Sequence, residues 1–166
     1  NAFANCINLA SLTIPNSVKS IDGGAFYNCS KLSSATLGSG LNSIRIATFG
    51  SCTSLKNIHI PNSITSIEER AFVLCTSLEE VLIPNSVLTL GDQAFRNCIS
   101  LEYLYLPEGL ETIGSEIFYA PREDNIDDSG DKNNQALGTL NENLGYRISE
   151  ITIPSTVKTV KSTAFN

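Results

Sequence analysis

The sequence predicts a solenoid, a chain wound into similar coils that stack along one axis, because three residue types recur with one spacing. Cysteine recurs every 23 residues, at Cys6, Cys29, Cys52, Cys75 and Cys98. Phenylalanine keeps the same period at Phe3, Phe26, Phe49, Phe72, Phe95 and Phe118, and leucine at Leu9, Leu32, Leu55, Leu78 and Leu101. A fixed period of about 20 to 50 residues is typical of repeats that bury their apolar faces against one another. We therefore expect a single domain over residues 1–166 with about six coils.

The first half of each coil is predicted to be a short strand. In the third coil, Ile58 and Ile60 alternate with polar residues, which indicates a strand with one buried face. Pro61 ends the strand, because proline cannot donate a hydrogen bond to a ladder. Residues 62–63, an Asn-Ser pair, favour the corner that follows.

The second half of the coil is predicted to return to the core through a turn. Ile64 and Ile67 indicate another short extended stretch, and residues 68–72 indicate a brief helical or 3₁₀ turn that brings Phe72 inward. Since stacked strands lie ~4.8 Å apart, each sequence column becomes a ladder through the interior. The expected class is α/β, rich in strands, with only short helical or 3₁₀ turns.

One stretch carries a family resemblance with particular clarity. Residues 78–98 read LEEVLIPNSVLTLGDQAFRNC. They resemble the BspA-type leucine-rich repeat, also called the Treponema pallidum type, with the approximate pattern L-x-x-I-x-I-P-x-S-V-x-x-I-G-x-x-A-F-x-x-C. The resemblance covers about 1–118 and 148–166, with departures at Gly38, which replaces the strand-ending proline, and at Thr48, which replaces an alanine. It implies a right-handed, horseshoe-like leucine-rich-repeat solenoid.

The regular spacing is broken once. The strand after Phe118 should begin six residues later, but the next matching segment begins at Ile148, so 24 extra residues are expected. We interpret 119–147 as an insertion loop within the last complete coil. Residues 125–130 imitate the start of an EF-hand calcium loop, but Ala136 stands where the bidentate glutamate belongs. A solvated excursion is favoured over a metal site.

The cysteine column is predicted to consist of buried thiols that fill one corner of each coil. Adjacent coils would bring the Cα atoms within disulfide reach, but the number of cysteines is odd. Stacked side chains also point the same way, which opposes the disulfide torsion of about 90°. A spacing of 23 residues differs from the C-x-x-C spacing of metal sites.

Composition and motifs exclude several classes of function. The net charge is −6 and no basic stripe is present, so no nucleic-acid partner is expected. No apolar run approaches the ~18 residues of a membrane span, so this segment is not expected to insert into a bilayer. The single histidine, His59, belongs to no triad pattern, and no phosphate-binding loop occurs. We predict no catalytic residues, no cofactor and no metal.

The outward positions of the first strands form surface columns whose composition changes along the stack. The first two coils present small polar residues, whereas later coils present large ones. The candidate patch consists of His59, Leu82, Tyr103 and Tyr105, with Glu79, Glu80 and Glu102 around them. Exposed aromatic residues with a polar rim are typical of interaction surfaces. The alternative is that tyrosine is present because it suits a strand.

The family that the chain resembles implies a function. Its members are commonly surface-exposed or secreted and are associated with adhesion. The resemblance implies a non-enzymatic adhesion or protein-binding module at the cell surface or secreted, with a partner such as a host matrix protein or another cell-surface protein. Two alternatives stay open: a carbohydrate-binding module, in which Tyr103 and Tyr105 would stack on sugars, and a passive spacer. Both ends fall at about the same phase of the repeat, so we expect the chain to come from a longer array.

Overall fold

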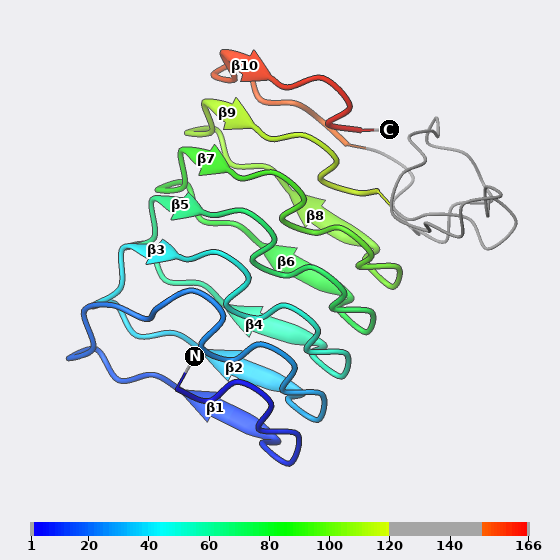
Figure 1. The fold of residues 1–166 in the computed structure, drawn as a ribbon. Helices are drawn as coiled ribbons and strands as arrows, with labels where there is room; N and C mark the ends of the chain where they lie inside the picture. Colours follow the sequence, from blue (N-terminus) through cyan, green and yellow to red (C-terminus); the bar gives the residue numbers. More distant parts are fainter. Residues whose placement is uncertain (1, 120–150, 166) are drawn as a thin grey trace, which may run out of the picture.

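The computed structural model describes residues 2–119 and 151–165. The chain winds into stacked coils, each with a short strand on one side and a shorter strand on the other (Figure 1). The front strands are β1 (Ser11–Thr13), β2 (Ser34–Thr36), β4 (Asn57–His59), β6 (Glu80–Leu82) and β8 (Tyr103–Tyr105). The rear strands are β3 (Ser43–Ile44), β5 (Ser66–Ile67), β7 (Thr89–Leu90), β9 (Thr112–Ile113) and β10 (Thr159–Val160). The predicted solenoid is confirmed.

Strand register follows the sequence period. All paired strands are parallel, and partners such as Ser43 and Ser66 are 23 residues apart. The exception is β9 with β10, where Thr112 pairs with Thr159, an offset of 47 residues and 24 more than elsewhere. The coils on either side of the long offset therefore stack directly on each other. The insertion predicted over 119–147 lies outside the described residues, apart from Tyr119.

The phenylalanine column forms the centre of the core. Consecutive rings from Phe3 to Phe95 have centroids 5.3–5.7 Å apart and planes within 8° of parallel. Such near-parallel stacks with separated centroids are the offset arrangement that aromatic pairs prefer. Phe49, Phe72 and Phe95 are completely buried. The repeat thus places one stacked ring in every coil.

The segments predicted as helical or 3₁₀ turns are single hydrogen-bonded turns, and no helix occurs among the described residues. Ala71 N–H donates to the Glu68 carbonyl, a bond between residues three apart. The residue between them, Arg70, has a φ of 56°. A left-handed residue cannot continue a right-handed helix, so the turn stops after one bond. The same column has positive φ at Gly24, Ala47, Gln93, Glu116 and Thr163.

A second column of left-handed residues directly precedes the cysteines. Its members are Asn5, Asn28, Ser51, Leu74 and Asn97, with φ between 57° and 62°. Each backbone N–H in this column donates to a carbonyl of the next coil, as Leu74 does to Arg96 at 2.8 Å. The left-handed conformation therefore directs the backbone donor along the stacking axis. Asparagine suits the position because it adopts this conformation more readily than most residues.

The cysteine column consists of buried free thiols, as predicted, except that Cys6 is only half-buried. The thiols of Cys29, Cys52, Cys75 and Cys98 donate to phenylalanine carbonyls of the preceding coil at 3.1–3.2 Å. Burial raises the pKa of Cys52 to about 12 and holds the pKa of Cys75 well above its ordinary value. Thiols that stay protonated are poor nucleophiles.

The departure at Gly38 has a steric cause. A Cβ atom added there would lie 2.5 Å from the Pro15 carbonyl carbon and 2.6 Å from its oxygen. The second coil therefore approaches the first too closely for any side chain at this corner. Glycine replaces the usual proline because only a residue without Cβ fits.

Candidate functional site

The structure places all seven residues of the candidate patch on the front side of the solenoid or at its edge. Alternation along each strand buries the central residue, Val81 in β6 and Leu104 in β8, and turns its neighbours outward. Leu82 is 62% exposed, Tyr103 55% and Tyr105 59%. These exposures are high for large apolar side chains.

The patch has a contiguous centre. β6 and β8 pair in register, so Glu80 lies beside Tyr103, and Leu82 lies beside Tyr105. Side chains opposite each other on adjacent strands are in reach of contact. Two tyrosines, one leucine and one glutamate therefore form a continuous surface on two coils.

The acidic rim is only partly neutralised. Lys56 Nζ lies 3.8 Å from Glu79 Oε1, and both side chains are exposed. Glu102 is half-buried, whereas Glu80 is exposed. Within residues 2–119 and 151–165, no ion pair or hydrogen bond involves the Glu80 carboxylate. The face thus carries an uncompensated negative charge beside its apolar centre.

His59 is separated from the centre of the patch. It lies on β4, where it pairs with Thr36 of β2. β4 and β6 do not pair, so the front strands form two sheets, β1-β2-β4 and β6-β8. The rear sheet, in contrast, runs unbroken from β3 to β10 (Figure 1). This interruption of the front sheet was not predicted from the sequence.

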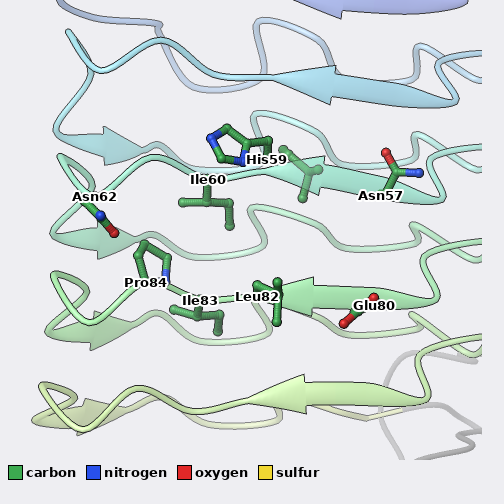
Figure 2. A pocket seen from close by; sticks show the side chains of 9 residues that line it. Asn57, His59, Ile60, Asn62, Glu80, Leu82, Ile83 and Pro84 are labelled. Carbon is green, nitrogen blue, oxygen red and sulfur yellow. The ribbon is translucent and has the colours of Figure 1, made fainter.

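A groove of about 450 Å³ occupies the interruption, and we call it the front groove. It is open to solvent, and its walls are the facing edges of β4 and β6. Figure 2 shows Asn57 and Glu80 at the end where the strands begin, and Asn62 and Pro84 at the end where they turn. Leu82 and the buried Ile60 lie between these two ends.

Backbone hydrogen bonds show where the two strands separate. The Glu79 N–H donates to the Lys56 carbonyl at 3.2 Å, just before both strands. Beyond this point no hydrogen bond joins β4 to β6 in the part of the chain that the structure describes. In the coils before, Leu37 N–H still donates to the His59 carbonyl at 3.3 Å, at the end of the β2–β4 pair. Ile60 occupies the same position one coil later, but its N–H makes no hydrogen bond to the Leu82 carbonyl.

The sequence contains one signal for this loss. The hydrogen bond at the end of the paired front strands occurs twice, from Ile14 to Thr36 and from Leu37 to His59. Both bonds involve the coil that carries Gly38 in place of proline. Such a bond is absent between the coils of Pro61 and Pro84, which both have proline there. The signal is incomplete, because the coils of Pro84 and Pro107 lack this bond and yet β6 and β8 pair.

The described residues hold no arrangement that suggests a metal centre. In 2–119 and 151–165, no three histidine, cysteine, aspartate or glutamate side chains come together as ligands. The buried thiols point into the core and not toward the candidate patch. None of the described segments forms a helix long and apolar enough to cross a bilayer.

Comparison with known proteins agrees with this architecture. The BspA-type leucine-rich-repeat region matches residues 1–123 with six copies. No curated protein gives a significant match. Among solved structures, the leucine-rich repeat protein of T. pallidum is 29% identical, with a TM-score of 0.63 over 66% of this chain and 53% of that one.

Two further structures are similar. A leucine-rich repeat protein from Bacteroides ovatus is 38% identical, with a TM-score of 0.67 over 70% of this chain and 30% of its own. A leucine-rich cell surface protein from Faecalibacterium prausnitzii is 27% identical, with a TM-score of 0.71 over 95% of this chain and 36% of its own. The chain spans about half, or less, of the length of these relatives. From the six matched repeats, the 23-residue ladders and the stacked phenylalanine column together, it follows that the chain belongs to the BspA-type leucine-rich-repeat family.

Proposed function

We propose that this chain is a non-enzymatic adhesion module of a cell-surface protein and that the candidate patch binds a partner protein. The observation that carries the proposal is the contiguous exposure of Leu82, Tyr103 and Tyr105 on two paired strands. In the first two coils the same two columns carry only small polar residues, Ser11, Thr13, Ser34 and Thr36. A cluster of exposed aromatic and aliphatic side chains with a polar rim is the composition of binding hot spots.

The scaffold favours recognition without rearrangement. Both tyrosines extend from a three-residue strand whose central residue, Leu104, is buried in the core. Tyrosine offers a large contact area and loses little conformational entropy when it is fixed. A preorganised surface also avoids part of the ordering cost of association. The acidic rim favours a partner with a basic surface, because complementary charge accelerates encounter.

The cell-surface location is supported by a relative. The similar protein from Faecalibacterium prausnitzii is described as a leucine-rich cell surface protein. The partner we propose is a host matrix protein or a protein of another cell surface.

A carbohydrate ligand is the second candidate. Tyr103 and Tyr105 lie on the same side of β8, so their rings could present two stacking platforms to a glycan. Free glycans would compete with such binding, whereas they would leave a protein–protein contact unchanged.

The proposal is tested by binding the chain to a panel of matrix proteins and glycans. The key variant carries Leu82→Ser, Tyr103→Ser and Tyr105→Ser. A matched control carries Ile7→Ser, Leu88→Ser and Ile99→Ser, which remove comparable exposed apolar surface away from the front strands. We expect saturable binding that the first variant loses and the control keeps. Equal binding by both variants would refute the patch, and no binding to any member would leave the spacer as the better account.

A further inference from the structure

The front groove differs from the rest of the front sheet in its free backbone groups. His59 uses its carbonyl on the β2 side, where Leu37 donates to it. Because peptide groups of a strand alternate sides, the N–H and carbonyl of Ile58 face β6. By the same alternation, the peptide groups of Glu80 and Leu82 face β4. Among the described residues, no hydrogen bond joins these groups across the gap.

Backbone groups without a partner in a partly enclosed groove favour a ligand that can satisfy them. The carbonyls of Ile58, Glu80 and Leu82 supply three acceptors along the groove, and the N–H groups of the same residues supply three donors. The Glu80 carboxylate, which has no cationic partner in the described residues, supplies a negative charge at the end where the strands begin. Leu82 adds an exposed apolar surface beside these acceptors. The site therefore has backbone donors and acceptors in equal number, and the Glu80 carboxylate adds a charged acceptor at one end of an apolar middle.

We propose that the front groove is an anchoring site for an arginine side chain of the partner protein. This inference rests on the proposed function, because it assigns the partner's chemistry at the same face. The guanidinium group would donate to the Glu80 carboxylate and to the free carbonyls, and its methylene stem would pack on Leu82. Arginine suits the groove better than lysine, because five donors in one plane can reach several acceptors while an ammonium acts as a point charge.

The rear groove does not share these properties. It measures about 380 Å³, and Lys161 Nζ lies 2.9 Å from Asp92 Oδ1 on its wall. The backbone N–H of Ser115 and the Lys161 ammonium hold the pKa of Asp92 below its usual range. Two more carboxylates line this groove and also have partners: Glu68 accepts from the Ile46 N–H at 3.1 Å, and Glu69 Oε1 lies 3.6 Å from Arg70 Nε. The three acidic side chains of the rear groove thus all have partners within the chain, whereas Glu80 has none among the described residues. Charge complementarity therefore assigns the basic ligand to the front groove.

The experiment titrates three capped tripeptides, acetyl-Gly-Xaa-Gly-amide with Xaa as arginine, citrulline or lysine, into ¹⁵N-labelled protein. We expect saturable shifts of the Ile58, Ile60 and Leu82 amides with the arginine peptide. Citrulline has the same shape without the charge and should bind about fivefold more weakly, the upper range of an exposed ion pair. Glu80→Gln should weaken the arginine peptide by about the same factor. Glu108→Gln, the same charge change at an exposed site in the turn after β8, should have no effect.

Four results would overturn the inference: no shift at these amides, equal binding of citrulline, equal binding of lysine, or an unchanged affinity in Glu80→Gln. A tyrosine tripeptide or a disaccharide that bound the same amides more tightly would also overturn it. The outcome is separable from the proposed function, because the peptides need no partner protein. If the arginine peptide binds while the matrix panel shows nothing, the proposed function fails and the anchoring site stands. If the tyrosine variants abolish partner binding but Glu80→Gln changes neither titration nor partner affinity, the proposed function stands alone.

Discussion

Backbone conformation at single residues recurs with the same 23-residue period as the core. In the column before the cysteines, three of five left-handed residues are asparagine, while Leu74 adopts φ 61° without that advantage. A left-handed conformation costs an ordinary residue roughly 1–2 kcal/mol. Leu74 therefore adopts the left-handed conformation against its own preference, because the hydrogen bond from its N–H to the Arg96 carbonyl of the next coil requires it.

Replacing Leu74 by asparagine is expected to stabilise the protein. Leu74 is 38% exposed, so little buried area is lost, and the free energy of unfolding should rise by roughly 0.5–1 kcal/mol. Urea denaturation measures the change. Leu88→Asn is the control, because Leu88 is similarly exposed but has no positive φ. A stability gain in both variants, or a loss in Leu74→Asn, would contradict the argument.

Substitution of Gly38 is expected to be costly. Gly38→Ala forces a Cβ atom to within 2.5 Å of the Pro15 backbone, so the free energy of unfolding should fall by roughly 1–3 kcal/mol. The neighbouring Ser39→Ala keeps the backbone N–H that donates to Asn16 Oδ1 at 2.8 Å and should change stability by less than about 0.5 kcal/mol. Thermal unfolding of the two variants side by side makes the comparison. Equal melting temperatures would show that the first two coils can separate freely.

The thiol column predicts how stability depends on alkaline pH. Burial raises the pKa of Cys52 to about 12, so the folded protein keeps a proton that the unfolded chain loses above about pH 8.5. The stabilisation is complete below that pH and is lost as the pH rises toward 12. Denaturation midpoints at pH 7, 9 and 10.5 should therefore fall steadily, and Cys52→Ala should flatten the decline. A midpoint that stays constant over this range would contradict the buried-thiol account.

At the scale of elements, the two sheets of the solenoid differ in continuity. The rear sheet pairs all neighbouring strands, and its bonds continue past the strands, as from Gly91 to Ile67 and from Gly114 to Leu90. The front sheet is divided between β4 and β6. The rear strands are therefore joined by a continuous ladder of hydrogen bonds, whereas β4 and β6 pack side by side with only the bond from Glu79 to Lys56 just before them.

Hydrogen exchange should detect this difference. The amides of Ile58, Ile60 and Leu82, which make no bond across the gap, should exchange at least about tenfold faster than those of Gly91 and Gly114. Amide exchange followed by NMR measures each site. Equal protection of the two groups would mean that the front sheet is closed in solution and that the front groove is not a persistent feature.

At the scale of the whole molecule, the sequence predicts the features that every coil shares, but not the features that differ in a single coil. The columns predict the stacked rings, the buried thiols and the outward position of Leu82 and Tyr105, because a fixed period gives each residue the same place in every coil. The left-handed columns were not predicted, since Arg70 and Leu74 carry no preference for positive φ. The front groove was not predicted either, because β4 and β6 have the same length and alternation as the strands that pair.

The partner's chemistry depends on the whole face. Every rear strand begins with serine or threonine, whereas the front column of Tyr105 changes from Thr13 and Thr36 to tyrosine along the stack. The proposed function therefore places most of the binding free energy at the tyrosine end of the stack. Central aromatic contacts commonly contribute about 2 kcal/mol or more to binding, whereas peripheral ones contribute little.

The most direct test compares Tyr105→Ala with Thr36→Ala, which occupy the same strand position in different coils, in their affinity for the partner protein found in the panel. The account predicts that Tyr105→Ala weakens binding by roughly 30-fold, which corresponds to about 2 kcal/mol, and that Thr36→Ala changes it less than about twofold. Equal effects of the two substitutions, or a larger effect of Thr36→Ala, would contradict the claim that the tyrosine end of the front face recognises the partner.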